Sequence, residues 1–481
     1  MAAALPVEQE GPTVISLEQA LEIALTESPT VKIADLEVER AEYARKGSYA
    51  SLFPQISASA SYQRTIKKQI MYMGGDDDED ESSGGGMSSM MSGILDPIMY
   101  HLQRLYAGTG VPYVEYVPAT TTESSSDGGI EVGRWNTFNA GINAQMPLIN
   151  AQLWKSLEIS GSSVDLAVEK ARSSRLEMVN QVKQAYYAVL LAKEAKQVYQ
   201  SVYDNAVQNL ELTNKKYNAS RASELDLARA KTTVANAVPD VFNAENAIFL
   251  SLWQLKAIMG IDLDADIDVK DSLLVYAGDM HPETLDKDYD LEGNSSLRQL
   301  AIQADQLANT VKMQRYSYLP TLSLAFSYSM NAMTNDFKFE QYKWTPYSYV
   351  GLSLNIPIFT GGQRHNEIRQ SKVQASQLAI QRENAERQLR ISIRQNLSTM
   401  ETAVKSHESA LDALESAQKA YDIAAKSYEV GRSTLTDLDA ARLALTQAQL
   451  AASQAIYNYL VAQATLESTI GADYTGESSV Q

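Results

Sequence analysis

The sequence of 481 residues contains no cysteine, which excludes disulfide bonds and thiolate metal ligands. Positive charge is also scarce, since 41 Lys and Arg stand against 59 Asp and Glu, a formal net charge of −18. A protein that binds a phosphate backbone needs clustered positive charge, so we expect no nucleic-acid partner. The few histidines lie far apart and support no catalytic or metal cluster: His101, His281, His365 and His407.

Long hydrophobic runs are missing as well. No stretch approaches the roughly 18 uninterrupted apolar residues of a membrane-spanning helix. Residues 1–5 are too short an apolar run for a signal peptide and lack a basic start. We therefore expect either a cytoplasmic protein or an exported one whose signal peptide has been removed. Tyrosine is abundant, with 26 Tyr against 8 Phe, which suits surfaces that are apolar at one end and wet at the other.

No catalytic motif stands out. Gly361-Gly362 lacks the Lys and Ser/Thr that follow the glycines of a phosphate-binding loop. Residue positions suggest neither a Ser-His-Asp triad nor a pair of catalytic carboxylates. We expect no enzyme activity, no cofactor and no metal site.

An internal repeat organises the chain, and a missed repeat would lead to the wrong fold. Landmarks of the first half recur in the second half at an offset of 210 or 211 residues. Pro54 and Pro320 correspond too, but they are 266 residues apart, which indicates an insertion of 56 residues between Pro54 and Pro147. The other corresponding pairs are Pro147 and Pro357, Tyr217 and Tyr428, Arg221 and Arg432, Asp226 and Asp437, and Gly260 and Gly471.

The insertion is rich in Gly, Ser and acidic residues, notably over 74–93 and 119–129. Such a composition cannot bury a core, so we expect an exposed loop. Six methionines lie between Met71 and Met99, beside the acidic run 76–81. Thioethers can bind Cu(I) and carboxylates can bind hard cations, but the spacing matches no fixed site. A solvated loop is the preferred interpretation.

Four stretches alternate apolar with small polar residues, a period of two that is typical of strands with one apolar and one polar face. A proline marks each junction between these strands and a helix, where its missing N–H costs least: Pro54, Pro147, Pro320 and Pro357. The apolar positions are Ile56, Ala58, Ala60 and Tyr62, then Phe138, Ala140, Ile142, Ala144 and Met146, then Leu322, Leu324, Phe326 and Tyr328, then Val350, Leu352, Leu354 and Ile356.

The stretches that follow have apolar residues at helical spacing. We expect long helices over 151–217 and 363–428, each about 100 Å at 1.5 Å per residue, and return helices over 224–260 and 435–470. Helices of this length exceed an ordinary domain and must pack side by side. Four strands in one chain leave two open edges and an uncovered apolar face, so we expect several chains to close a transmembrane barrel.

From about Ser16 to Ala472, the chain resembles the TolC-like outer membrane efflux proteins. The resemblance rests on the doubled architecture, on Leu52-Phe-Pro54 and Tyr318-Leu-Pro320 before strands, on Pro357-Ile-Phe-Thr-Gly-Gly362, and on the turn from Tyr428 to Asp437. It implies an α+β membrane protein of TolC-like fold. In that fold a homotrimer builds one 12-stranded transmembrane β-barrel, four strands per chain, continuous with a long periplasmic α-helical barrel.

The resemblance also implies location and partners. The protein is expected in the outer membrane lipid of a Gram-negative bacterium, extending into the periplasm. There it would be the exit duct for an inner-membrane RND or ABC transporter, working through a periplasmic adaptor protein. Drugs, metals and secreted proteins all remain open as substrates. The alternative is a soluble, elongated coiled-coil scaffold whose alternating stretches are short hairpins.

On this basis we divide the chain into seven segments. They are 1–51 (N-terminal segment and upper helices), 52–147 (strands one and two, with an external loop at 65–134), 148–260 (first long helical hairpin), 261–318 (equatorial linker and helix), 319–358 (strands three and four), 359–471 (second hairpin) and 472–481 (tail).

The resemblance assigns a periplasmic entrance to the turns of the two hairpins. Asp226 and Asp437 match the acidic positions there, and three chains would place six carboxylates around one constriction, favouring cations. The competing interpretation is a first-turn Asp that only stabilises the helix start.

Four further residues of these turns, Tyr217, Tyr428, Arg221 and Arg432, could tie one hairpin to the next and hold the entrance shut. The family's arginine stands one residue after Arg432, and its second acidic position falls on Ala440, next to Asp439. The competing interpretation is that these are plain solvated turn residues. By position, we expect the same turns to meet the adaptor through Ser220, Gly431 and Ser433.

Overall fold

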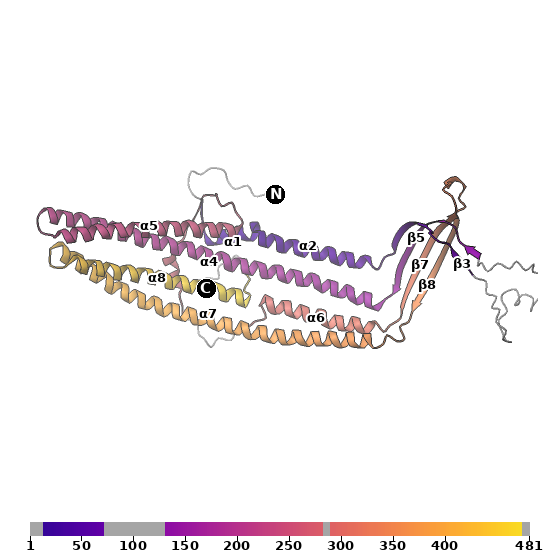
Figure 1. The fold of residues 1–481 in the computed structure, drawn as a ribbon. Coiled ribbons are helices and arrows are strands. Elements are labelled where there is room, and N and C mark those ends of the chain that lie inside the picture. The colour runs from indigo at the N-terminus through magenta and orange to yellow at the C-terminus, as the bar shows by residue number, and fades with distance from the viewer. Residues whose placement is uncertain (1–12, 72–129, 282–288, 474–481) are drawn as a thin grey trace, which may run out of the picture. The chain divides into compact units, whose positions relative to one another are not determined.

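The structure is a computed structural model that describes residues 13–71, 130–281 and 289–473 (Figure 1). The chain forms two compact units. The β unit comprises residues 52–148 and 322–354, and the helical unit comprises the rest of the chain. The Met-rich acidic run and most of the expected external loop lie outside the described residues, so the metal hypothesis stays untested.

The β unit is a four-stranded sheet in the order β2-β5-β7-β8. The alternating stretches are confirmed as its strands, and β5 and β7 extend beyond the stretches that the pattern marked. Pro147 lies inside β5 rather than at its end, beyond the last pairing with β2 at Gln145, where β2 requires no N–H from it. The strands are β2 (Gln55–Arg64), β5 (Asn136–Ile149), β7 (Thr321–Thr334) and β8 (Thr345–Asn355).

The register of β2 and β5 confirms one apolar and one polar face. Ile56 lies opposite Ala144, and Tyr62 lies opposite Phe138. The residues between them form the other face, where Ser57 is paired with Asn143 and other Ser, Gly and Asn residues meet. Side chains of opposed residues lie on the same side of an antiparallel sheet, so the period-two pattern of each strand continues across the pair.

Short elements complete the fold. Strand β1 (Thr13–Ile15) pairs in parallel with β6 (Ile267–Val269), and β3 (Gln69–Met71) pairs antiparallel with β4 (Ile130–Val132). The 3-10 helices are η1 (Leu273–Asp279) and η2 (Phe339–Gln341).

The helical unit is built from two long hairpins, and the predicted helix bounds agree with the structure to within a residue or two. Helices α4 and α5 form the first hairpin, and α7 and α8 form the second, while α2 and α6 lie along α4 (Figure 1). Pro239 lies inside α5 without ending it. The helices are α1 (Leu17–Glu27), α2 (Pro29–Ala50), α4 (Ala151–Asn218), α5 (Glu224–Met259), α6 (Ser295–Tyr316), α7 (Gln363–Glu429) and α8 (Leu435–Ile470).

A buried cluster joins α1, α4, α5, α7 and α8 near the middle of the long helices. Its largest fully buried members come from each of these helices: Leu21, Tyr186, Leu190, Leu255, Met259, Leu397, Met400 and Ile456. The Tyr186 hydroxyl donates to Asp271 Oδ2 at 2.7 Å, which satisfies the polar end of a side chain that is otherwise apolar. Burial and the nearby Asp271 carboxylate raise the pKa of Tyr186, so its hydroxyl stays neutral.

Arg172 of α4 ties together the end of α8 and the start of α6. Its guanidinium donates to the carbonyl oxygens of Gly293 (3.0 Å) and Gly471 (2.8 Å), to Glu169 Oε1 (3.0 Å) and to Asp473 Oδ1 (2.9 Å). A planar fork with five donors is suited to holding two backbone carbonyls and two carboxylates at once. Arg172 thereby satisfies carbonyls that would otherwise be partly buried without partners.

Gly471, whose carbonyl accepts from Arg172, follows α8 and ends it in the left-handed conformation, with φ of 82°. A Cβ added there would lie 2.1 Å from the Gly293 carbonyl oxygen. Both the backbone conformation and the close approach therefore require glycine.

We expect Gly471→Ala to lower the free energy of unfolding by about 3 kcal/mol, since the left-handed backbone and the steric overlap both add cost. Gly361→Ala is the matched control. Gly361 has φ of 63° but nothing within 4 Å of an added Cβ, so this variant should lose only about 1 kcal/mol. Equal melting temperatures for the two variants, measured by circular dichroism in detergent, would contradict the role of the close approach.

Arg172→Ala should cost about 3 kcal/mol, because it leaves several partly buried acceptors unpaired. Arg172→Lys should recover only part of this, since an ammonium cannot span the same acceptors. Arg175→Ala is the comparison, because its 2.5 Å contact with Asp35 is half exposed and should contribute under about 1 kcal/mol. Thermal unfolding of the three variants ranks these effects. Similar losses of stability for Arg172→Ala and Arg175→Ala would contradict the role of Arg172 in tying α8 to α6.

Candidate functional site at the hairpin tips

The turns of the two hairpins have the same backbone geometry, as the repeat predicts. The first turn follows α4, and its Ser220 takes up φ of 53°, the one positive φ among non-glycine residues that the structure describes. Gly431 follows α7 at the corresponding position with φ of 77°. In both turns the next amide closes back on the helix, from Arg221 N to Lys216 O and from Arg432 N to the Ser427 carbonyl, each at 2.8 Å. The repeat therefore holds at the level of single backbone hydrogen bonds.

Both predicted entrance aspartates form capping boxes. Asp226 N donates to Ser223 Oγ at 3.1 Å, and Asp226 Oδ2 accepts from the Ser223 amide and hydroxyl. Asp437 has the same relationship with Thr434. These hydrogen bonds from the capping hydroxyl, and then from the capping amide, hold the pKa of each carboxyl below its usual range. The two aspartates thus start the return helices and remain charged near neutral pH.

Tyr428 makes the contact that joins the two hairpins near these turns. Its hydroxyl lies 2.6 Å from Thr213 Oγ1 on α4. The Thr213 hydroxyl itself donates to the Asn209 carbonyl at 2.7 Å, so the Tyr428 hydroxyl is the donor in the cross-link. Lys216 Nζ lies 4.1 Å from the centre of the Tyr428 ring and also donates to the Tyr428 carbonyl. One tyrosine is therefore held through its hydroxyl, its ring and its backbone.

A small apolar cluster surrounds this cross-link. Thr213 and Tyr428 are both buried. Tyr428 packs with residues of α5 and α8 in a cluster separate from the central core. Burial lowers the pKa of Lys216, while the nearby Glu429 opposes that effect. The buried members are Ala230, Tyr428, Leu435 and Leu438, and the partly buried ones are Leu210, Leu212, Tyr421, Ala424 and Ala425.

A second, weaker link connects α5 with α8. Arg229 Nη1 donates to Thr436 Oγ1 at 3.5 Å, and Thr233 Oγ1 donates to Asp439 Oδ2 at 3.3 Å. Arg442 lies 3.4 Å from the same Asp439 carboxylate on the next turn of α8. Asp439 therefore bridges the two hairpins, although it stands one position before the acidic site that the resemblance implied.

The other predicted residues lie on the surface of the turns. Tyr217 corresponds to Tyr428 in the repeat, yet it is 39% exposed. Arg221 and Arg432 are exposed and form no hydrogen bond or ion pair through their side chains with any residue that the structure describes. Near the turns, two predicted residues, Tyr428 and Asp439, thus join the hairpins through partners that the sequence did not single out, namely Thr213, Lys216 and Thr233. Arg229 and Thr436 add a further contact between α5 and α8.

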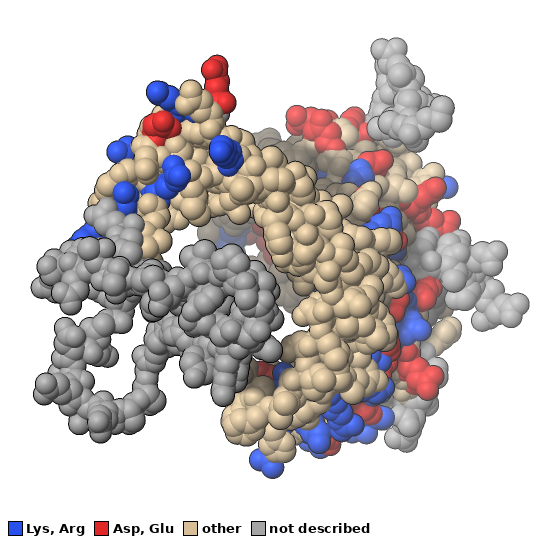
Figure 2. Space-filling model, turned by 90° about the vertical axis from the view of Figure 1, so that its right-hand side faces the viewer, with Lys and Arg blue, Asp and Glu red and all other residues tan. Residues whose placement is uncertain are grey.

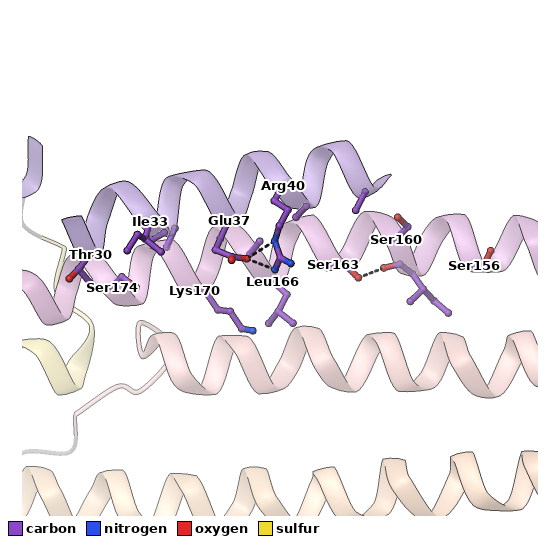
Figure 3. Close-up of a pocket in the computed structure, with 16 residues that line it drawn as sticks. Thr30, Ile33, Glu37, Arg40, Ser156, Ser160, Ser163, Leu166, Lys170 and Ser174 are labelled. Carbon is purple, nitrogen blue, oxygen red and sulfur yellow. Dashed lines mark hydrogen bonds and ion pairs between the residues drawn. The ribbon is translucent and has the colours of Figure 1, made fainter. Parts of the chain in front are cut away.

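A groove of about 810 Å³ runs between α2 and α4 in the helical unit (Figure 3). Small side chains of both helices line it, including Ala34, Ala41, Ser160 and Ser163. Ile33 and Leu166 add apolar surface. None of the predicted site residues lies in it. Small side chains at helical spacing allow another helix to approach closely, so the composition of the groove suits the packing of a further helix.

Among the described residues, no helix is long and apolar enough to cross a membrane. No group of three or more His, Asp or Glu side chains in the same residues is placed to hold a metal ion.

Comparison with known proteins identifies the family. The family model for "outer membrane efflux protein" matches residues 111–261 and 290–472, well over half of the chain. The chain is 22% identical to the outer membrane protein TolC of Escherichia coli over 348 residues, which is 70% of each protein. It is also 22% identical to the alkaline protease secretion protein AprF of Pseudomonas aeruginosa over 253 residues, 52% of each protein.

Solved structures show the same fold at lower sequence identity. The CmeC outer membrane channel of Campylobacter jejuni superposes with a TM-score of 0.66 at 18% identity, covering 97% of this chain and 90% of CmeC. VceC of Vibrio cholerae gives a TM-score of 0.65 at 15% identity, with 95% and 96% covered. With its two long hairpins and its four-stranded sheet, the chain belongs to the outer membrane efflux protein family and has the TolC-like fold of an outer membrane exit duct.

Proposed function

We propose that three copies of this chain form one continuous duct through the outer membrane and into the periplasm. The observation that carries this proposal is the sheet of the β unit, which has one apolar face, one polar face and two edge strands, β2 and β8. In a bilayer, unpaired backbone groups at such edges would be very costly, so the edges must be closed. Three chains of four strands close into a 12-stranded barrel with the polar face inward.

The helical unit supports the same assembly. Helix α2 exposes Ile33, Leu36 and Tyr43 beside the groove that it forms with α4, and α7 exposes Val373 and Ile380. Apolar faces at the two sides of one helical layer fit a closed ring in which one copy's α7 packs against the next copy's α2.

Within such a ring, we infer that the hairpin tips form the periplasmic entrance. Asp226 and Asp437 would supply a ring of six carboxylates, and the Thr213–Tyr428 contact would hold the two hairpins of each chain together. Residues of the turns, the exposed Ser220 and Gly431 and the half-buried Ser433, would meet a periplasmic adaptor. That adaptor would couple the duct to an inner-membrane RND or ABC transporter.

The names found in the comparisons cover both efflux and secretion. The family is named for outer membrane efflux, and AprF is named for alkaline protease secretion. We therefore assign this chain the shared step, passage of a substrate to the exterior, and expect no catalytic activity, no cofactor and no bound metal.

The assembly is tested by reconstitution. The detergent-solubilised protein should have three times the 52.9 kDa mass of the chain in light scattering, and it should form ion-conducting channels in planar bilayers. A monodisperse monomer in plain buffer, without conductance, would favour the coiled-coil scaffold instead.

Tyr428→Phe should raise single-channel conductance, because it removes the hydroxyl that bonds Thr213 and weakens the link between the hairpins. The loss of one such bond amounts to about 1 kcal/mol. Tyr217→Phe is the matched control, since this tyrosine occupies the same place in the repeat but is exposed. Equal conductance for Tyr428→Phe, Tyr217→Phe and the unchanged protein would show that the Tyr428 hydroxyl does not help to keep the entrance closed.

Asp437→Asn should lower the preference for cations, whereas Asp412→Asn, an exposed change within α7, should not. The folded pKa of Asp437 lies below its unfolded value near 4. The stabilising contribution of its charge is therefore complete above that value and is lost as the pH falls through the folded pKa.

The lowered pKa of Asp437 also predicts how the cation selectivity depends on pH. The difference in cation preference between Asp437→Asn and the unchanged channel should persist from pH 8 to pH 5 and shrink only in stronger acid. Reversal potentials measured in a salt gradient check both statements. A difference that disappears between pH 7 and pH 5 would show that the carboxyl titrates near neutrality and would contradict the capping argument.

A further inference from the structure

The long strands of the β unit carry almost no charge. In β2, β5, β7 and β8 together, the sole charged side chain is that of Arg64, the last residue of β2. Charge returns at the connections from β2 to β5 and from β7 to β8, at the opposite strand ends from those that lead into the helices. The described residues there include three acidic ones, Glu131, Asp336 and Glu340, and six basic ones, which we call the basic rim: Arg64, Lys67, Lys68, Arg134, Lys338 and Lys343.

Hydrogen bonds bring the three segments of the basic rim together. Arg64 lies opposite Asn136 in the register of β2 and β5. The amide of Thr65 donates to the Trp135 carbonyl at 2.8 Å, and the Trp135 amide donates to Asn335 Oδ1 at 3.2 Å. Lys68 Nζ lies 4.7 Å from the centre of the Trp135 ring. Figure 2, which faces this end of the β unit, shows blue Lys and Arg side chains gathered with fewer red ones beside a surface of uncharged residues.

The basic rim adjoins an aromatic cluster on the apolar face of the sheet. The rings of Tyr62 and Phe138 are stacked at 4.9 Å. The β7–β8 connection folds over them, with Phe337 at 6.1 Å from Tyr62 and Tyr342 at 5.4 Å from Phe138. Two residues on from Tyr62, Arg64 continues the same face of β2.

Lys338 and Lys343 stand next to Phe337 and Tyr342 in the sequence. This cluster therefore combines apolar rings with flanking cations, the composition that favours the boundary between hydrocarbon and lipid headgroups.

The acidic residues of the described ranges leave most of the basic rim without an ion pair. The Asp336 carboxylate accepts from Thr334 Oγ1 at 2.7 Å, within its own turn. Arg64, Lys67, Arg134, Lys338 and Lys343 are exposed and form no ion pair with any residue of the described ranges. Among the described residues of this region, six basic side chains stand against three acidic ones, in a chain whose net charge is −18. Residues 72–129 of the same connection, with the acidic run 76–81, lie outside the described ranges.

We propose that the basic rim binds the phosphate groups of the lipid in the outer leaflet of the outer membrane. The orientation rests on the proposed function, since only in an outer-membrane duct do these connections face the exterior. Guanidinium and ammonium groups form charge-assisted hydrogen bonds with phosphate oxygens. Basic side chains at a membrane surface attract anionic lipids additively. The strands, uncharged except for Arg64 at the end of β2, lie in the hydrocarbon, and the aromatic cluster places the rim at the level of the headgroups.

The test uses the purified full-length protein in a zwitterionic detergent, titrated with lipid A or with chemically dephosphorylated lipid A. A ligand that binds the folded state raises its melting temperature in proportion to the logarithm of ligand concentration over the dissociation constant. We expect lipid A to stabilise the protein and dephosphorylated lipid A to have a much smaller effect. The variant Arg64→Gln/Lys67→Gln/Lys338→Gln/Lys343→Gln should bind lipid A at least tenfold more weakly.

Two controls make the outcome decisive. Lys231→Gln/Lys426→Gln removes two exposed charges from the helical unit and should leave lipid A affinity unchanged. Arg64→Lys/Lys338→Arg keeps the charge and should retain binding. Light scattering and bilayer conductance report separately whether each variant still forms a channel, so failure of the lipid proposal is distinguishable from failure of the duct.

Equal affinity of the fourfold variant and the unchanged protein would overturn the proposal, as would equal binding of the two lipids. If high affinity for lipid A emerged only after deletion of residues 76–81, the basic rim would bind that acidic run of the same chain instead. This result would also overturn the proposal.

Discussion

The whole molecule depends on the need to pair backbone groups at the edges of a four-stranded sheet. Each strand presents an apolar face, and in hydrocarbon no water can satisfy the N–H and C=O groups of an edge strand. One chain has two such edges, β2 and β8. In the proposed duct, further copies of the chain close that sheet and the polar face lies inward, while the scarcity of charge within the strands suits their place in the hydrocarbon.

Duplication explains the helical unit, but its two halves are no longer equivalent. The turns after α4 and α7 share the same backbone hydrogen bonds and the same capping boxes. Tyr217 and Tyr428, however, occupy equivalent positions with opposite burial. Because Tyr428 lies between α4 and α7 while Tyr217 lies outside that contact, one copy of the motif makes a cross-link and the other provides surface. The repeat preserves local geometry, whereas the packing of one copy on the other breaks its symmetry.

The site could be predicted from the sequence only in part, for a physical reason. Asp226 and Asp437 were found because they recur 211 residues apart in the repeat and match acidic positions of the family that the chain resembles. The capping boxes that they form came from the structure. Thr213 and Lys216 were missed because nothing near them in the sequence distinguishes them from other helical residues. Their importance comes from a tyrosine more than two hundred residues away. Arg221 and Arg432 attracted attention as charged landmarks of the repeat, yet their side chains form no hydrogen bond or ion pair with any residue in the described part of the chain.

The sequence by itself determined the strands, the long helices, their turns and the two faces of the sheet. These follow from periodicity and from proline and glycine positions, which act over short distances along the chain, and from a repeat that can be read directly in the sequence. Only the tertiary structure decided which side chains join the hairpins, how Arg172 ties α8 to α6, and that the β7–β8 connection covers Tyr62 and Phe138. Such contacts depend on the register and rotation of packed elements, and a change of one helical residue turns a side chain by about 100°. No local pattern of residues encodes that rotation.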